Sequence, residues 1–248
     1  MNREKINFLK AKMRKVTDEF NLKFLSTCDK CDNKHEVDLF DYFASIFITC
    51  PQCKVKATHE KPVHMSNFGE VPFYKQKFVD GHFKVIQQLT VSGIDFSQDI
   101  VEGQEVFFDY NWDFANGVAD IYTSLEMFLY ELTCKKLEEL VTSGKKINIG
   151  NPKFEKNPNI LELVEKINSH EIFESNIILE EVEGSFRIKD CRILLEELGA
   201  INKKDLNCCY DIQKLRNNIV HRGQRANFED YADIFIEVGR IFNVYKFK

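Results

Sequence analysis

The sequence has no apolar run that approaches the roughly 20 residues of a membrane-spanning helix. Its first residues, MNREKINFLKAKMRK, also lack the apolar core of a secretory signal. No internal repeat and no low-complexity segment interrupts the chain. From these absences we expect a cytoplasmic protein without a membrane partner.

The chain also lacks the excess of positive charge that bulk binding to nucleic acid requires, because its net charge is -5. The charge is unevenly distributed, however. Residues 1–90 contain 15 Lys and Arg against 11 Asp and Glu, whereas residues 91–109 contain no Lys or Arg. With 248 residues, of which 44% are hydrophobic, the chain can form two domains with their own cores, and a local basic site remains compatible with the composition.

Eight cysteines in a reducing compartment do not indicate a disulfide framework, and four of them occur in pairs. The pairs are Cys28 with Cys31 and Cys50 with Cys53, two C-x2-C motifs separated by 18 residues. Two such turns can place four thiolates tetrahedrally around one Zn²⁺ per chain, and the full shell makes the site structural. The segment over about residues 24–57 resembles a zinc ribbon. The alternative is that these cysteines are unliganded core residues.

Other elements surround the cysteine motifs. Apolar residues at steps of three and four over residues 6–20 predict an amphipathic helix with a basic face. Residues 73–110 have an alternating, β-rich pattern, with Asp80-Gly81 as a hairpin turn. We therefore predict a first domain over residues 1–109, made of a helix, a zinc ribbon and a small sheet.

Helical patterns fill the rest of the chain. Stop signals at Gly144, Gly199 and Gly223 separate the predicted helices, and the residues 110–248 form an all-helical bundle in this prediction. The predicted fold class is therefore α+β. The longest helix carries an apolar stripe of Val118, Ile121, Tyr122, Leu125, Phe128, Leu129, Leu132, Leu137 and Leu140.

The segment LRNNIVHRG contains the residues with the most informative chemistry. Arg216 can donate two N–H groups to a phosphate, and His221 can exchange a proton near neutral pH. Asn217 and His221 lie four positions apart, hence on one helix face, so we expect Asn217 to orient the imidazole ring. Arg216 must reach around the helix with its long side chain.

This arrangement resembles the HEPN superfamily of helical domains, whose motif is Arg, usually Asn, three variable residues and then His. Arg216, Asn217 and His221 match this motif, in the penultimate predicted helix where the family keeps it, and the resemblance covers about residues 110–248. It implies a metal-independent endoribonuclease with its active site at a homodimer interface. It also implies 2′,3′-cyclic phosphate and 5′-hydroxyl ends, and a role in toxin or antiviral defence systems with a regulatory protein or antitoxin as partner.

In such a ribonuclease Arg222 and Arg225 would contact flanking phosphates of the RNA substrate. Other interpretations stay open at this point. Arg216 can pair with a carboxylate such as Asp211 or Glu229, and His221 can cap the helix. A non-catalytic HEPN domain that binds RNA or nucleotides, or that serves as a dimerisation adaptor with a zinc-ribbon interaction domain, is the alternative function.

Overall fold

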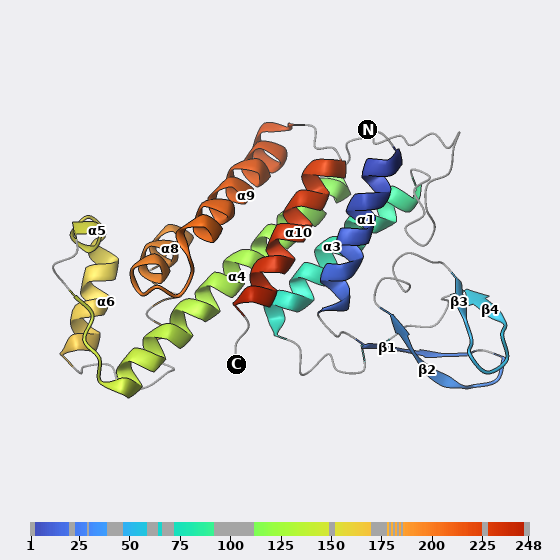
Figure 1. Ribbon diagram of the computed structural model, residues 1–248, viewed down its shortest axis with the longest axis horizontal. Helices are drawn as coiled ribbons and strands as arrows, with labels where there is room; N and C mark the ends of the chain where they lie inside the picture. Colours follow the sequence, from blue (N-terminus) through green and yellow to red (C-terminus); the bar gives the residue numbers. More distant parts are fainter. Residues whose placement is uncertain are drawn as a thin grey trace. The chain divides into compact units, whose positions relative to one another are not determined.

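The computed structural model describes residues 3–19, 23–28, 30–38, 47–58, 64–65, 72–91, 112–148, 152–169, 178, 180, 182, 184, 186–224 and 228–245. Over these residues the protein is mostly helical, as predicted, with short strands near its N-terminus (Figure 1). The helices are α1 (Arg3–Asp18), α3 (Phe73–Val91), α4 (Trp112–Ser143), α5 (Pro152–Glu155), α6 (Pro158–Asn168), α8 (Ile188–Glu197), α9 (Lys203–Arg222) and α10 (Phe228–Val244). The strands are β1 (Lys23–Thr27), β2 (Lys34–Asp38), β3 (Phe47–Thr49), β4 (Lys56–Thr58) and β5 (His64–Met65).

The strands form two small antiparallel sheets. β1 pairs with β2 on one side and with β5 on the other, with Thr27 opposite Lys34 next to the first turn. β3 pairs with β4, with Thr49 opposite Lys56 next to the second turn. Each C-x2-C motif therefore occupies the turn of one hairpin.

The predicted β-rich segment after residue 73 is wrong over residues 73–91, which form helix α3. Tyr74, Phe78, His82 and Val85 recur at helical spacing and are all buried, so they form one core-facing stripe. Asp80 and Gly81 lie inside this helix and make no hairpin turn. The remainder of the predicted sheet, residues 92–110, lies outside the described residues.

The glycine at position 81 of α3 leaves room for the backbone of a neighbouring helix. A Cβ atom at this position would lie 2.7 Å from the carbonyl oxygen of Gly117 and 2.9 Å from the backbone nitrogen of Ile121, both in α4. Such distances are shorter than van der Waals contact. A glycine therefore allows α3 and α4 to cross with their backbones nearly in contact.

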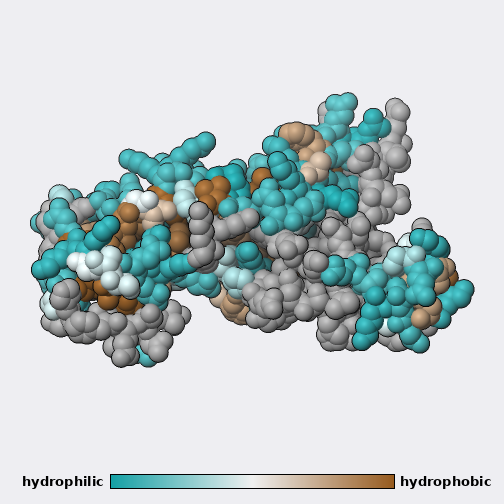
Figure 2. Space-filling view, turned by 60° about the horizontal axis from the view of Figure 1, so that its bottom comes forward, coloured by the Kyte–Doolittle hydropathy of each residue, from teal (hydrophilic) through white to brown (hydrophobic). Residues whose placement is uncertain are grey.

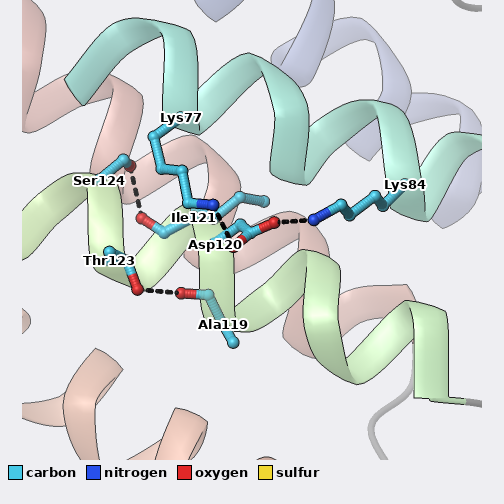
Figure 3. Close-up of polar contacts among 7 residues, drawn as sticks. All are labelled: Lys77, Lys84, Ala119, Asp120, Ile121, Thr123 and Ser124. Atoms are coloured by element: carbon cyan, nitrogen blue, oxygen red, sulfur yellow. Dashed lines mark hydrogen bonds and ion pairs between the residues drawn. The ribbon is translucent and has the colours of Figure 1, made fainter. Parts of the chain in front are cut away.

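Ion pairs reinforce the same crossing. Figure 3 shows Asp120 of α4 between two lysines of α3, with Oδ1 at 2.8 Å from Nζ of Lys77 and Oδ2 bonded to Lys84. Aromatic rings join α3 to α10: Phe78 stacks on Phe235 with centroids 4.5 Å apart, and Tyr74 meets Phe242 edge-on at 4.8 Å. These contacts form the core of this part of the chain.

Contacts divide the protein into two compact units. One contains Met1–Ser124 and Ile212–Lys246, and the other contains Leu125–Asp211 with Phe247–Lys248. This division does not coincide with the predicted boundary at residues 109 and 110, because α4 and α9 each contribute to both units. The second unit has its own apolar core, with Leu137, Phe154 and Leu194 almost completely buried.

No helix in the described part of the chain is both long and apolar enough to cross a membrane. On the face that Figure 2 presents, hydrophilic residues cover much of the described surface, with smaller hydrophobic patches between them.

Candidate functional site

The two C-x2-C turns share one backbone geometry. The N–H of Cys28 donates to the carbonyl of Asn33 at 3.0 Å, and Cys50 repeats this bond with Val55 at 3.0 Å. The residue after the second cysteine of each pair has positive φ, 53° at Asp32 and 58° at Lys54. Both turns therefore present their cysteines in the same way.

The four sulfurs of these turns lie together, with every pair within 4.8 Å. Sγ of Cys28 is 3.6 Å from Sγ of Cys53, and Sγ of Cys31 is 3.7 Å from Sγ of Cys50. A tetrahedral site with Zn–S bonds of about 2.3 Å requires sulfurs about 3.8 Å apart. The predicted cluster is thus confirmed as a group of residues that can hold a metal ion.

The protonation of these thiols also indicates that the cluster suits a cation. Backbone N–H groups, first that of Cys53 and then that of Gln52, lower the pKa of Cys50 to about 6. The pKa of Cys31 moves the other way, to about 12, because desolvation and the other three sulfurs outweigh the hydrogen bond from the N–H of Asn33. Four neighbouring thiolates repel one another, so a bound cation is what allows all four to ionise together.

The predicted motif lies in α9, which begins and ends at local sequence signals. Asn202 caps the first turn through its Oδ1, which accepts from the N–H of Asp205 at 2.9 Å. At the other end Gly223 has φ 63°, and the N–H of Gln224 bonds the carbonyl of Asn218 at 3.0 Å. The predicted stop at Gly223 is confirmed, and it places the motif in the last two turns of the helix.

The side chains of Arg216, Asn217 and His221 meet at one point. Nη1 of Arg216 lies 2.8 Å from Oδ1 of Asn217 and 2.8 Å from Nε2 of His221. A guanidinium can only donate, so we assign Nε2 as the acceptor in this contact, which places the ring proton on Nδ1. Asn217 contacts Arg216 and not the imidazole ring, which corrects the prediction that Asn217 orients that ring.

Arg216 is half-buried, and it forms no ion pair with a carboxylate among the described residues. Its Nε is buried without a hydrogen-bond partner in that part of the chain. The guanidinium carbon instead lies 5.5 Å from the ring centroid of Tyr122 in α4, within the range of a cation–π interaction. Glu229, one of the carboxylates considered for Arg216, pairs with Lys5.

Tyr122 is the residue of this site that sequence reasoning missed. Its spacing along α4 is that of the apolar core stripe, and it is 3% exposed, so no sequence signal separates it from its neighbours. His221 and Arg222 are exposed at the end of α9. Arg225 lies outside the described residues, so its predicted contact with RNA remains a prediction.

The other four cysteines do not form a second cluster with one another within the described residues. Cys134, Cys191 and Cys209 are buried, and Cys208 is partly buried. Burial raises the pKa of Cys191 and of Cys209 to about 12, which makes both thiols unreactive. They fill the core as small apolar residues.

Comparisons with protein-family models, with curated proteins and with solved structures each find no match for this chain.

Proposed function

We propose that this protein is a metal-independent endoribonuclease of the HEPN kind, with Arg216, Asn217 and His221 as its catalytic residues. One observation carries the proposal: the 2.8 Å contact between Nη1 of Arg216 and Nε2 of His221. It brings a permanent cation and a neutral imidazole together at an exposed helix end. Attack of an RNA 2′-hydroxyl on the adjacent phosphorus needs both groups: a base that accepts the hydroxyl proton and a positive charge that stabilises the phosphorane.

In the proposed reaction the neutral His221 accepts the proton of an RNA 2′-hydroxyl, and that oxygen bonds to the adjacent phosphorus. The bond from phosphorus to the 5′-oxygen breaks, which leaves a 2′,3′-cyclic phosphate and a 5′-hydroxyl. Arg216 neutralises the charge that grows on the non-bridging oxygens. A phosphate that takes the N–H of Arg216 also frees Nε2 of His221 to act as the base.

A second copy of the chain completes the proposed site. In-line displacement places the attacking and leaving oxygens on opposite sides of the phosphorus, so one imidazole cannot serve both. The 5′-oxygen is protonated by His221 of the partner subunit. The exposure of His221 supports this arrangement, because a second helix end must be able to reach the same phosphate.

The cysteine cluster has a structural role in this proposal, with one Zn²⁺ per chain bound by Cys28, Cys31, Cys50 and Cys53. Sulfur separations of 3.6 and 3.7 Å support a small tetrahedral ion. The bound ion stabilises two hairpins that are too short to fold alone. The ribbon also serves to recruit RNA or a regulatory partner, in keeping with a role in toxin or antiviral defence.

A second candidate is a non-catalytic RNA-binding or dimerisation adaptor. The same contact favours it in one respect: Arg216, Asn217 and His221 already satisfy one another within the chain. A domain that no longer cleaves RNA can retain these hydrogen bonds because they stabilise the end of the helix. The two candidates differ in one respect that can be tested: removal of the imidazole of His221 lowers RNA cleavage in the ribonuclease, whereas the adaptor has no cleavage to lose.

To test the proposal, the purified protein with its structural metal bound is incubated with mixed RNA in a buffer without added magnesium or other divalent cations, and the product ends are mapped. We expect cyclic phosphate and 5′-hydroxyl ends, and no cleavage of DNA, which lacks the nucleophile. His221→Ala should lower cleavage by at least about 10²-fold, the usual contribution of a general base. Asn207→Ala, an exposed change in the same helix, should retain full activity. Ends with a 3′-hydroxyl, or equal activity of His221→Ala, would show that the proposal is wrong.

A further inference from the structure

No described contact of Arg216 neutralises its positive charge with a negative one. Its described contacts are with neutral groups: the amide oxygen of Asn217, the imidazole nitrogen of His221 and the ring of Tyr122. A carboxylate at the position of Tyr122 would hold the guanidinium more strongly, but it would also cancel the charge that an anionic ligand needs. An aromatic face attracts the cation and uses none of its N–H donors.

Tyr122 is also rigid enough to fix the position of the guanidinium. Its side chain is 3% exposed, and its neighbours Ile121 and Leu125 in α4 are 0% and 1% exposed, so the ring is packed in a core. An arginine side chain has many rotamers, and a fixed surface beneath it limits their number. The contact between Nη1 and Nε2 then depends on where the ring holds the guanidinium.

We infer that Tyr122 is a positioning residue: its ring holds Arg216 so that Nη1 reaches Nε2 of His221 and the N–H groups of Nη2 stay available to a phosphate oxygen. The catalytic part of this inference rests on the proposed ribonuclease function. The geometric part does not, because it concerns which nitrogen of His221 carries the proton in the free protein.

The test is a comparison of the His221 tautomer in variants of Tyr122, measured on the full chain by long-range ¹H–¹⁵N correlation at a pH where the ring is neutral. In the native protein and in Tyr122→Phe, which keeps the ring, we expect the proton to reside on Nδ1. In Tyr122→Leu the guanidinium loses its support, and we expect a mixture of both tautomers. Tyr74→Leu removes another buried tyrosine of the same unit, so it is the control for general damage to the core. It should leave the tautomer of His221 unchanged.

RNA cleavage is the second readout. Cation–π contacts are worth about 0.5–2 kcal/mol, so Tyr122→Leu should lower kcat about two- to thirtyfold while Tyr122→Phe retains the native rate. An unchanged tautomer in a folded Tyr122→Leu protein overturns the inference. A changed tautomer supports it even if no form of the protein cleaves RNA, in which case only the proposed function fails. Should Tyr122→Leu not fold, Tyr122→Met preserves more of the side-chain length and replaces it as the ring-less variant, with the same two outcomes.

Discussion

Gly81→Ala tests the close crossing of α3 and α4, the helix that also contains Tyr122. The added Cβ would lie 2.7 Å from the carbonyl oxygen of Gly117 and 2.9 Å from the nitrogen of Ile121. Both are backbone atoms, so no side-chain rotation relieves the contact and the helices must move apart. Overpacking of this kind costs about 1–3 kcal/mol, and alanine regains up to about 1 kcal/mol through its higher helix propensity. We expect a net loss of about 1–2 kcal/mol in the free energy of unfolding.

Urea denaturation followed by far-UV circular dichroism measures this loss, because the described residues are mostly helical. Gly184→Ala is the matched control: its Cβ would meet nothing within 4 Å, and its φ is not in the left-handed region. That change should leave stability equal to the native value or raise it slightly. A Gly81→Ala protein as stable as the native one would mean that the two helices do not cross here at backbone contact.

Two further predictions concern the metal cluster and a buried histidine. Cys50→Ser removes one thiolate, so the metal content should fall from near one ion per chain toward zero by elemental analysis, while Cys208→Ser, outside the cluster, keeps its metal. Equal metal content in the two variants would contradict the cluster. Burial lowers the pKa of His82 from 6.5 to about 3, so between these values the unfolded chain binds a proton that the folded chain does not. The free energy of unfolding should therefore decrease as the pH is lowered from 6.5 to about 3, by up to about 1.4 kcal/mol per pH unit from this group. His82→Gln should reduce this slope when urea denaturation is measured at each pH. An unchanged slope would show that another group controls the acid limb.

The parts of the structure that the sequence predicts well are those determined within a few residues. Each C-x2-C motif forms a turn that is closed by local backbone hydrogen bonds and followed by a residue with positive φ, and the cluster consists of the cysteines of these two turns. The end of α9 at Gly223 has the same local origin, since glycine adopts the left-handed conformation without a Cβ clash. Each turn and the helix end thus depend on residues that are close in the sequence.

The errors have a different physical cause. Asp80-Gly81 has the composition of a hairpin turn, but the reason for Gly81 lies in α4, where Gly117 approaches it. Tertiary packing therefore decided between two local structures that the pattern allowed. The spacing of four residues places Asn217 and His221 on one helix face, as predicted, but the long side chain of Arg216 reaches around the helix and contacts both the amide oxygen and the imidazole nitrogen.

The neutral surroundings of Arg216 also bear on why the motif contains an amide. Asn217 supplies an oxygen acceptor at 2.8 Å, and a carboxylate in its place would make a stronger hydrogen bond with the same geometry. It would also form an ion pair with Arg216, and the pair would have to be broken or shared before a phosphate could bind. The neutral imidazole and the ring of Tyr122 follow the same rule, since each holds the guanidinium without opposing its charge. A purely structural arginine has no need of this restriction, whereas one that receives an anion does, and this difference favours the catalytic or RNA-binding proposals over a role in helix stability alone.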